Sequence, residues 1–299
     1  MKQLTLWWIR VVRVTQYFIP GMVVCILLLH GVPAAAQEDS AAQPAPAAAQ
    51  ASSAAQPALE AQAKMMLTRM ADFLSKAQSF STTVDVGFDV VQDSGQKIEF
   101  GETRKITIRR PDHVRIETTK RDGSVGGFFF DGKEIAVFNV QDKVYATVPK
   151  PGTLDAAFDY FTNDLDMRLP LAELLSSDFP KLLQERVREV DYVEQEAIAG
   201  VPCDHLALRG DRVDMQMWIA KGEQPLPHRL IITYTLAEGQ PQFWAQFSQW
   251  NLAPEVPDSL FAFTPAAGAV KIAFMPPAVQ PGGDTGGDDT EGEDDTKGE

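Results

Sequence analysis

A long series of short segments with a two-residue period constrains the fold of this chain more than any other feature. Apolar and polar residues alternate from Phe80 to Val90, which is typical of a strand with one buried face. The turn Asp93-Ser94-Gly95-Gln96 follows, and turns as short as Gln141-Asp142 and Ala199-Gly200 recur between later segments. Connections of this length join antiparallel neighbours. The pattern therefore predicts a meander of antiparallel strands.

Two groups of predicted strands are separated by a helical stretch. The first group comprises Phe80–Val90, Ile98–Arg110, Val114–Thr118, Gly127–Phe130, Glu134–Val140 and Lys143–Val148. The second group comprises Glu185–Ala197, Cys203–Arg209, Val213–Ala220, Arg229–Leu236 and Gln242–Asn251.

Two helical elements are predicted beside the strands. Residues from Leu59 to Ala77 carry apolar side chains at three- and four-residue spacing, as does an insert over about 153–183, and this spacing predicts helices with one apolar face. A long meander must close or be covered, because a free edge is prone to pair with other chains. The fold class is therefore α+β: a curved antiparallel sheet, or incomplete barrel, of about 10–11 strands, covered by the N-terminal helix and the helical insert.

Four segments are expected along the chain. Residues 1–36 are predicted to be a signal peptide, and 37–58, rich in Ala, Pro and Gln, to be a disordered linker. The single folded domain is expected at 59–278. Residues 279–299 hold eight acidic residues and one lysine, which predicts a disordered acidic tail.

The first segment predicts export to the periplasm. Lys2, Arg10 and Arg13 precede an apolar run over 19–29, and the small residues Ala34-Ala35-Ala36 follow, as in a signal peptide cleaved after its small residues. An uncleaved anchor stays open as an alternative. Cys25 would leave with this segment, so the remaining Cys203 has no partner for an internal disulfide.

Charge limits the partners that the protein can bind. The formal net charge of −14 argues against nucleic acid, because phosphate binding needs a basic surface. It argues equally against tight adhesion to anionic lipid, so any membrane contact is expected to be peripheral or transient. The protein is expected to be a monomer.

The residue pattern predicts no enzyme, cofactor or metal site. Cys203 and His205 share one face of a predicted strand, where a metal site is conceivable, but a buried cysteine beside a hydrogen-bonded histidine is the favoured interpretation. Two residues so placed point side by side, which is poor geometry for proton transfer to a nucleophile. The glycines of 123–127 lie between strands, where a hairpin loop is favoured over a phosphate cradle.

Three motifs together resemble the LolA/LolB-like superfamily of outer-membrane lipoprotein carriers. They are a strand that ends in Arg109-Arg110-Pro111, the hairpin Phe130-Asp131-Gly132-Lys133-Glu134, and Phe261-Ala262-Phe263-Thr264-Pro265. The strand before Arg110 lacks the tryptophan common in those carriers. Segments such as Trp218-Ile219-Ala220 look closer to an uncharacterised bacterial branch of predicted periplasmic proteins.

The resemblance implies a hydrophobic cavity beneath a helical lid, in which the arginine before the proline bonds to the lid. That arginine is Arg110, and its parity places it on the apolar face, whereas Arg115 falls on the opposite face. A charge on an apolar face needs a partner. The residues expected to line the cavity or lid are Phe88, Ile106, Ile108, Arg110, Phe128, Phe130, Phe158 and Phe161.

The functional hypothesis is a non-catalytic periplasmic binding protein. Its ligand is expected to be a lipid, an acylated protein or another apolar group, held between the curved sheet and the helical lid. The alternative is a structural or interaction module whose barrel is filled by its own side chains.

Overall fold

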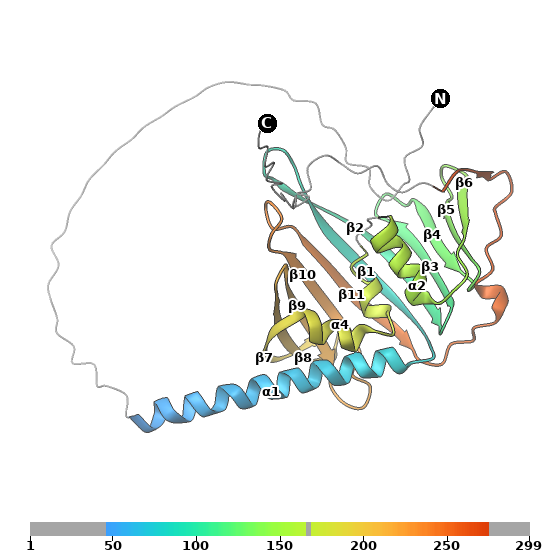
Figure 1. The fold of residues 1–299 in the computed structure, drawn as a ribbon. Coiled ribbons are helices and arrows are strands. Elements are labelled where there is room, and N and C mark those ends of the chain that lie inside the picture. Colours follow the sequence, from blue (N-terminus) through green and yellow to red (C-terminus); the bar gives the residue numbers. More distant parts are fainter. Residues whose placement is uncertain (1–45, 166–168, 275–299) are drawn as a thin grey trace, which may run out of the picture.

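One curved antiparallel sheet dominates the computed structural model, which describes residues 46–165 and 169–274 (Figure 1). Within these residues the strand order is β12-β6-β5-β4-β3-β2-β1-β11-β10-β9-β8-β7. All pairs are antiparallel except β12 with β6. The strands are β1 Ser79–Val91, β2 Lys97–Arg109, β3 His113–Lys120, β4 Val125–Phe130, β5 Glu134–Asn139, β6 Val144–Pro149, β7 Val187–Ile198, β8 Val201–Gly210, β9 Val213–Ala220, β10 Pro227–Tyr234, β11 Gln242–Asn251 and β12 Val270–Lys271.

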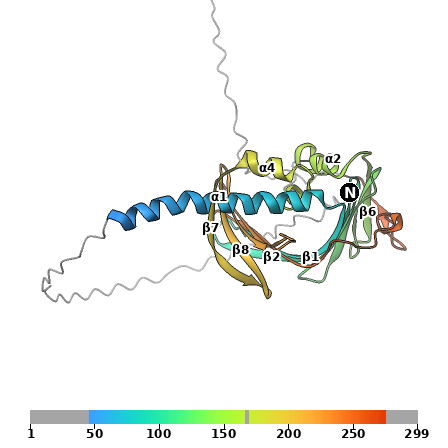
Figure 2. The ribbon, with the colours of Figure 1, turned by 90° about the horizontal axis from the view of Figure 1, so that it is seen from below.

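The sheet does not close, and the helices lie across its open side. Figure 2 shows it as a trough in section, with α1, α2 and α4 spanning the mouth. The helical elements are α1 Pro46–Lys76, α2 Leu154–Asp159, the π-turn η1 Tyr160–Asp164, α3 Ala172–Leu175, α4 Phe179–Arg186 and the 3-10 turn η2 Asp258–Leu260. Helix α1 packs against β7, β9, α3 and α4. The predicted α+β architecture is confirmed, with the short β12 as an additional strand.

The core lies between the concave face of the sheet and these helices. Cross-strand partners share a face, and Phe80 pairs with Ile108 while Val84 pairs with Phe247. Among the side chains with at most 2% exposure are Met70, Leu74, Phe80, Ile106, Ile108, Phe130, Ile135, Leu154, Leu175, Leu206 and Phe247. Every layer of the fold contributes to this set, so burial of apolar surface holds the helices to the sheet.

The first helix begins earlier in the chain than predicted. It begins at Pro46 rather than at Leu59, so the expectation of a disordered linker is corrected for residues 46–58. Proline is tolerated in a first helical turn, and the alanine and glutamine that follow are strong helix formers. The predictions for 1–36, 37–45 and 279–299 lie outside the described residues. No helix in the described ranges is both long and apolar enough to cross a membrane.

The chain after β11 returns across the convex face of the sheet. Arg109 pairs with Asp258 at 2.6 Å, and Arg115 donates to the carbonyl oxygen of Leu260 at 3.2 Å. Phe261 is 1% exposed, and the ring of Phe263 packs on three aromatic rings of β4, β5 and β6. The Phe-x-Phe motif therefore fastens the C-terminal segment to the outside of the sheet. It forms no strand of its own.

The docking of α1 can be tested with two leucines of the same helix. Leu74 is 0% exposed and Leu59 is 45% exposed. Leu74→Ala should lower the free energy of unfolding by about 2–5 kcal/mol, because it leaves a cavity in the core. Leu59→Ala should change it by about 0.5 kcal/mol or less. Urea denaturation checks both, and equal losses would contradict the placement of α1.

Candidate ligand-binding site

The covered half of the concave face is apolar and tightly filled. Ile106 and Ile108 of β2 and Phe130 of β4 are at most 1% exposed beneath the helices. Phe128 of β4 meets Phe161 of η1 edge-on, with ring centroids 5.3 Å apart. Apart from Phe88, which lies beyond the helices, the predicted sheet residues are thus brought together here with Phe161 of the predicted lid. Two hollows on the described surface lie along α1 and over β1, β2, β10 and β11, and neither is lined by these core residues.

Arg110 connects the sheet to two of the covering helices. It follows β2, and its Nε donates to the carbonyl oxygen of Ala77, the residue directly after α1, at 3.2 Å. Its Nη2 donates to the carbonyl oxygen of Leu175 in α3 at 2.8 Å. Burial lowers the pKa of Arg110, and the charge of Asp155 opposes that shift. The guanidinium is therefore half-desolvated and bonded to main-chain carbonyls, as a charge on this face requires.

Asp155 ties the start of α2 to the end of α3. One carboxylate oxygen accepts from Ser176 Oγ at 2.7 Å and from the Ser177 backbone N–H at 2.9 Å. Burial raises the pKa of Asp155, but hydrogen bonds from Ser177 and Ser176 and the charge of Arg110 outweigh burial and lower it. Arg110 and Asp155 therefore hold the two parts of the helical insert in one arrangement.

The segment α2–η1 is held by aromatic rings. Phe158 and Phe161 are 7% and 5% exposed, and the ring of Phe274 lies 6.1 Å from that of Phe161. Lys150 Nζ lies 4.5 Å from the centroid of Tyr160. The π-turn interrupts the regular helix here, and such turns occur frequently at functional sites.

The concave face continues beyond the helices along the β1–β2 hairpin. Phe88 stacks on its cross-strand partner Phe100, with centroids 6.1 Å apart. Phe100 and Ile98 are 39% and 40% exposed. Phe88 therefore lies on the predicted face, but the contacts of its ring are with this exposed pair. Phe100 and Ile98 are separated from Ile106 by an even number of residues, so they lie on the same face of β2. This spacing could have identified them from the sequence.

A polar cluster divides the covered half from the exposed half. Glu102 pairs with Val86, and Arg104 with Val84, so both lie on the concave face. They form an ion pair of 2.5 Å. Thr118, the cross-strand partner of Arg104, is fully buried, and its Oγ1 has no hydrogen-bond partner. Sequence reasoning missed this cluster. The buried face of β2 was assigned from its apolar residues, and the two charged residues between them on the same face were overlooked.

Cys203 shows no sign of nucleophilic chemistry. Its side chain is buried and bonds to the carbonyl oxygen of Val201 at 3.3 Å. Burial raises the pKa of the thiol, which keeps it protonated and unreactive at neutral pH. This agrees with the interpretation of Cys203 as a small buried residue.

The hydrogen bonds of Asp155 predict a pH-dependent stability. Because the folded pKa of Asp155 is depressed, its contribution is present above the unfolded pKa and is lost as pH falls through the folded pKa. Asp155→Asn should cost about 1.5–3 kcal/mol at neutral pH, and this difference from wild type should shrink at about pH 3. Urea denaturation at both pH values checks this, with the exposed Asp159→Asn of α2 as control. A cost that is unchanged at low pH would contradict the assignment.

The chain matches the model of one protein family, described as "Predicted periplasmic protein (DUF2092)", over residues 63–275. None of the curated proteins matches it. Among solved structures, it is similar to the lipoprotein LppX from Mycobacterium tuberculosis at 15% identity, over 67% of this chain and 99% of that one, with a TM-score of 0.41. LprF from Mycobacterium bovis is 14% identical over 66% and 96% of the two chains, with a TM-score of 0.43.

A LolA superfamily protein from Nitrosomonas europaea is 14% identical, over 67% of this chain and 97% of that one, with a TM-score of 0.35. The architecture described above is the unclosed sheet covered by helices that the LolA/LolB-like resemblance implied. The family match confirms the interpretation of a predicted periplasmic branch. Because the match covers more than half of the chain, the protein belongs to this family of predicted periplasmic proteins and is periplasmic.

Proposed function

We propose that this protein is a non-catalytic periplasmic binding protein that carries or senses a lipid, an acyl chain or another apolar group. The ligand binds on the concave face of the sheet, beneath the helical insert. The residues that contact it are drawn from Phe88, Ile106, Ile108, Phe128, Phe130, Phe158 and Phe161, with Arg110 as the residue that controls access.

The observation that carries this proposal is the bonding of Arg110. One side chain on the apolar face bridges α1 and α3 through two main-chain carbonyls. Burying a guanidinium costs free energy that an apolar residue at the same place would avoid. A latch that can break and reform gives a reason for the charge, because a released guanidinium regains its hydration when the helices open.

Opening of the insert would exchange one apolar contact for another. The rings of Phe128 and Phe161 meet edge-on and Phe158 is buried nearby in the same core, and an acyl chain offers these rings the same kind of apolar surface. A charged hydrogen bond contributes about 1.5–3 kcal/mol. The loss of the Arg110 bonds therefore shifts the closed-to-open equilibrium by about ten- to hundredfold.

The exposed half of the concave face supplies a place of first contact. Phe88, Phe100 and Ile98 form an apolar surface next to the covered core. The buried hydroxyl of Thr118 and the pair Glu102–Arg104 lie between the two halves. An amphipathic ligand fits this order, with its polar group at Thr118 and its chain against the rings.

The alternative is a self-filled module without a ligand. The near-complete burial of Ile106, Phe130 and Leu154 favours it, because side chains already fill the space beneath the helices. Native mass spectrometry of protein isolated from the periplasm separates the two functions. A complex whose mass exceeds that of the protein by the mass of a lipid supports the carrier. Protein without lipid that also fails to bind added fatty acid supports the self-filled module.

The partners proposed follow from the same site. The cargo is a free lipid or the acyl group of an acylated protein. The protein acts as a monomer and takes up this cargo through peripheral and transient contact with a membrane. A net charge of −14 disfavours lasting adhesion to anionic lipid.

Replacement of Arg110 tests the latch directly. Arg110→Leu should keep the fold, because leucine suits an apolar face. It should raise the affinity for an apolar fluorescent dye by about ten- to hundredfold. Dye titration monitored by fluorescence, with circular dichroism as the check on folding, measures this.

Arg115→Leu is the matched control on the convex face. Arg115 also donates to a carbonyl oxygen of a distant segment, that of Leu260, but it lies on the opposite face of the sheet. Its loss should reduce stability and leave dye affinity unchanged. Equal effects of the two substitutions on dye binding would overturn the latch and the assignment of faces.

A further inference from the structure

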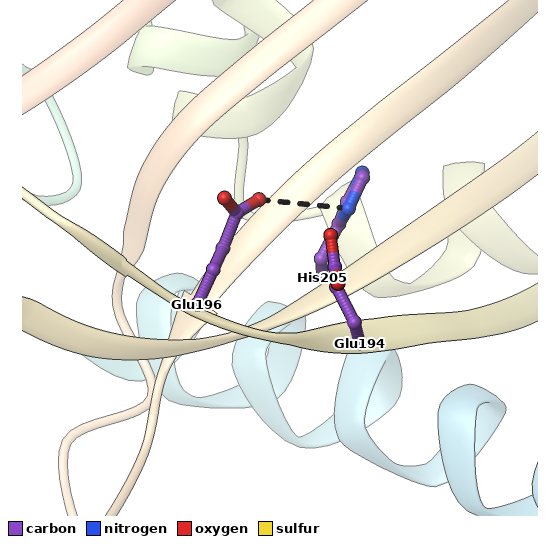
Figure 3. A group of neighbouring side chains, drawn as sticks. All are labelled: Glu194, Glu196 and His205. Atoms are coloured by element: carbon purple, nitrogen blue, oxygen red, sulfur yellow. Dashed lines mark ion pairs between the residues drawn. The ribbon is translucent and has the colours of Figure 1, made fainter.

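Three potential metal ligands meet on the convex face, on the side of the sheet away from the proposed ligand site. Glu194 and Glu196 lie on β7, and His205 lies on β8 directly opposite Glu194. One ligand atom from each residue lies within 4.8 Å of the others. Figure 3 shows the two carboxylates and the imidazole directed toward the same space. The carboxylates are exposed and the histidine is buried.

The imidazole of His205 has one satisfied nitrogen and one unsatisfied nitrogen. Nε2 lies 3.2 Å from Gln216 Oε1. An amide oxygen accepts hydrogen bonds and does not donate them, so Nε2 carries the proton. With that proton on Nε2, Nδ1 presents a lone pair, and Nδ1 is buried without a hydrogen-bond partner in a residue only 9% exposed. An unsatisfied buried nitrogen of this kind calls for a partner.

The distance from Nδ1 to Glu196 points to a metal ion as that partner. Nδ1 lies 3.6 Å from Glu196 Oε1, which is too long for a hydrogen bond. Two ligands on one tetrahedral zinc ion, with bonds of about 2.1 Å, are about 3.4 Å apart. The observed separation is close to that value. The exposed Glu194 can rotate toward an ion held by His205 and Glu196 without disturbing the core.

Neighbouring residues hold His205 and Glu196 in position. The ring of His205 stacks on Trp218, with centroids 4.1 Å apart and planes inclined by 10°. The indole N–H of Trp218 donates to Glu196, and Gln216 fixes the tautomer of His205. Metal-binding histidines and carboxylates are usually oriented by such outer hydrogen bonds. Arg229, the nearby cation, lies against the ring of Trp218, which also contacts His205.

We propose that Glu194, Glu196 and His205 bind one divalent ion of the zinc class, through His205 Nδ1 and one oxygen of each carboxylate. One imidazole and two carboxylates form a ligand set that zinc accepts readily. Three protein ligands leave the fourth tetrahedral position open to water or to a ligand from a partner. The site depends neither on the helical insert nor on the apolar face.

Zinc titration of the full-length periplasmic protein tests the site. Chelator-treated wild-type protein titrated with zinc chloride by calorimetry should bind one ion per chain at the site. Glu196→Gln and His205→Gln should each weaken that binding at least about tenfold. The matched control is Glu189→Gln, on the same strand and paired with Arg209, and it should bind zinc as the wild type does.

A measurement on the wild type removes any dependence on the folding of the variants. In a nitrogen-15 NMR spectrum of the histidine side chains, zinc should shift Nδ1 of His205 and leave Nε2 protonated. Shifts confined to His113 or His228 would overturn the proposal. So would the absence of saturable binding, or binding that persists unchanged in His205→Gln.

Discussion

The hydrogen bonds of one arginine join the sheet to the helices that cover it. Arg110 follows β2 and donates to Ala77, the residue after α1, and to Leu175 of α3, while Asp155 secures the same region from the side of α2. The apolar core beneath these bonds supplies most of the stability. In the proposed function, these bonds set the balance between a concave face covered by the helices and one that contacts an apolar ligand.

The two faces of the sheet carry different sets of side chains. The concave face buries apolar side chains under helices and leaves Phe88, Phe100 and Ile98 in an uncovered extension. The convex face is fastened by the C-terminal segment over β3 to β6, and it carries Glu194, Glu196 and His205 at its other end. Because the strands alternate their side chains, one sheet supports both arrangements without conflict.

Strands, turns and the face of Arg110 were predictable because they follow from local periodicity. The bounds of β9 and β11 agree with the pattern at both ends. Long-range features were not predictable. The helix start at Pro46 depends on propensity without an apolar signal, and the ring partner of Phe88 depends on the length of the hairpin. A bulge between Tyr192 and Glu194 exchanges the two faces of β7 for the residues that follow. Counting every second residue from Tyr192 would therefore have placed Glu194 on the concave face.

Photocrosslinking tests the central claim, that an apolar ligand binds on the concave face under the insert. The protein would be irradiated with a fatty acid that carries a photoactivatable group, and the labelled peptides would be identified by mass spectrometry. Labels on β1, β2 and α2, near Phe88, Phe100 and Phe158, are the predicted result. Labels confined to the convex face, or no labelling above that of an unrelated acidic protein, would contradict the account.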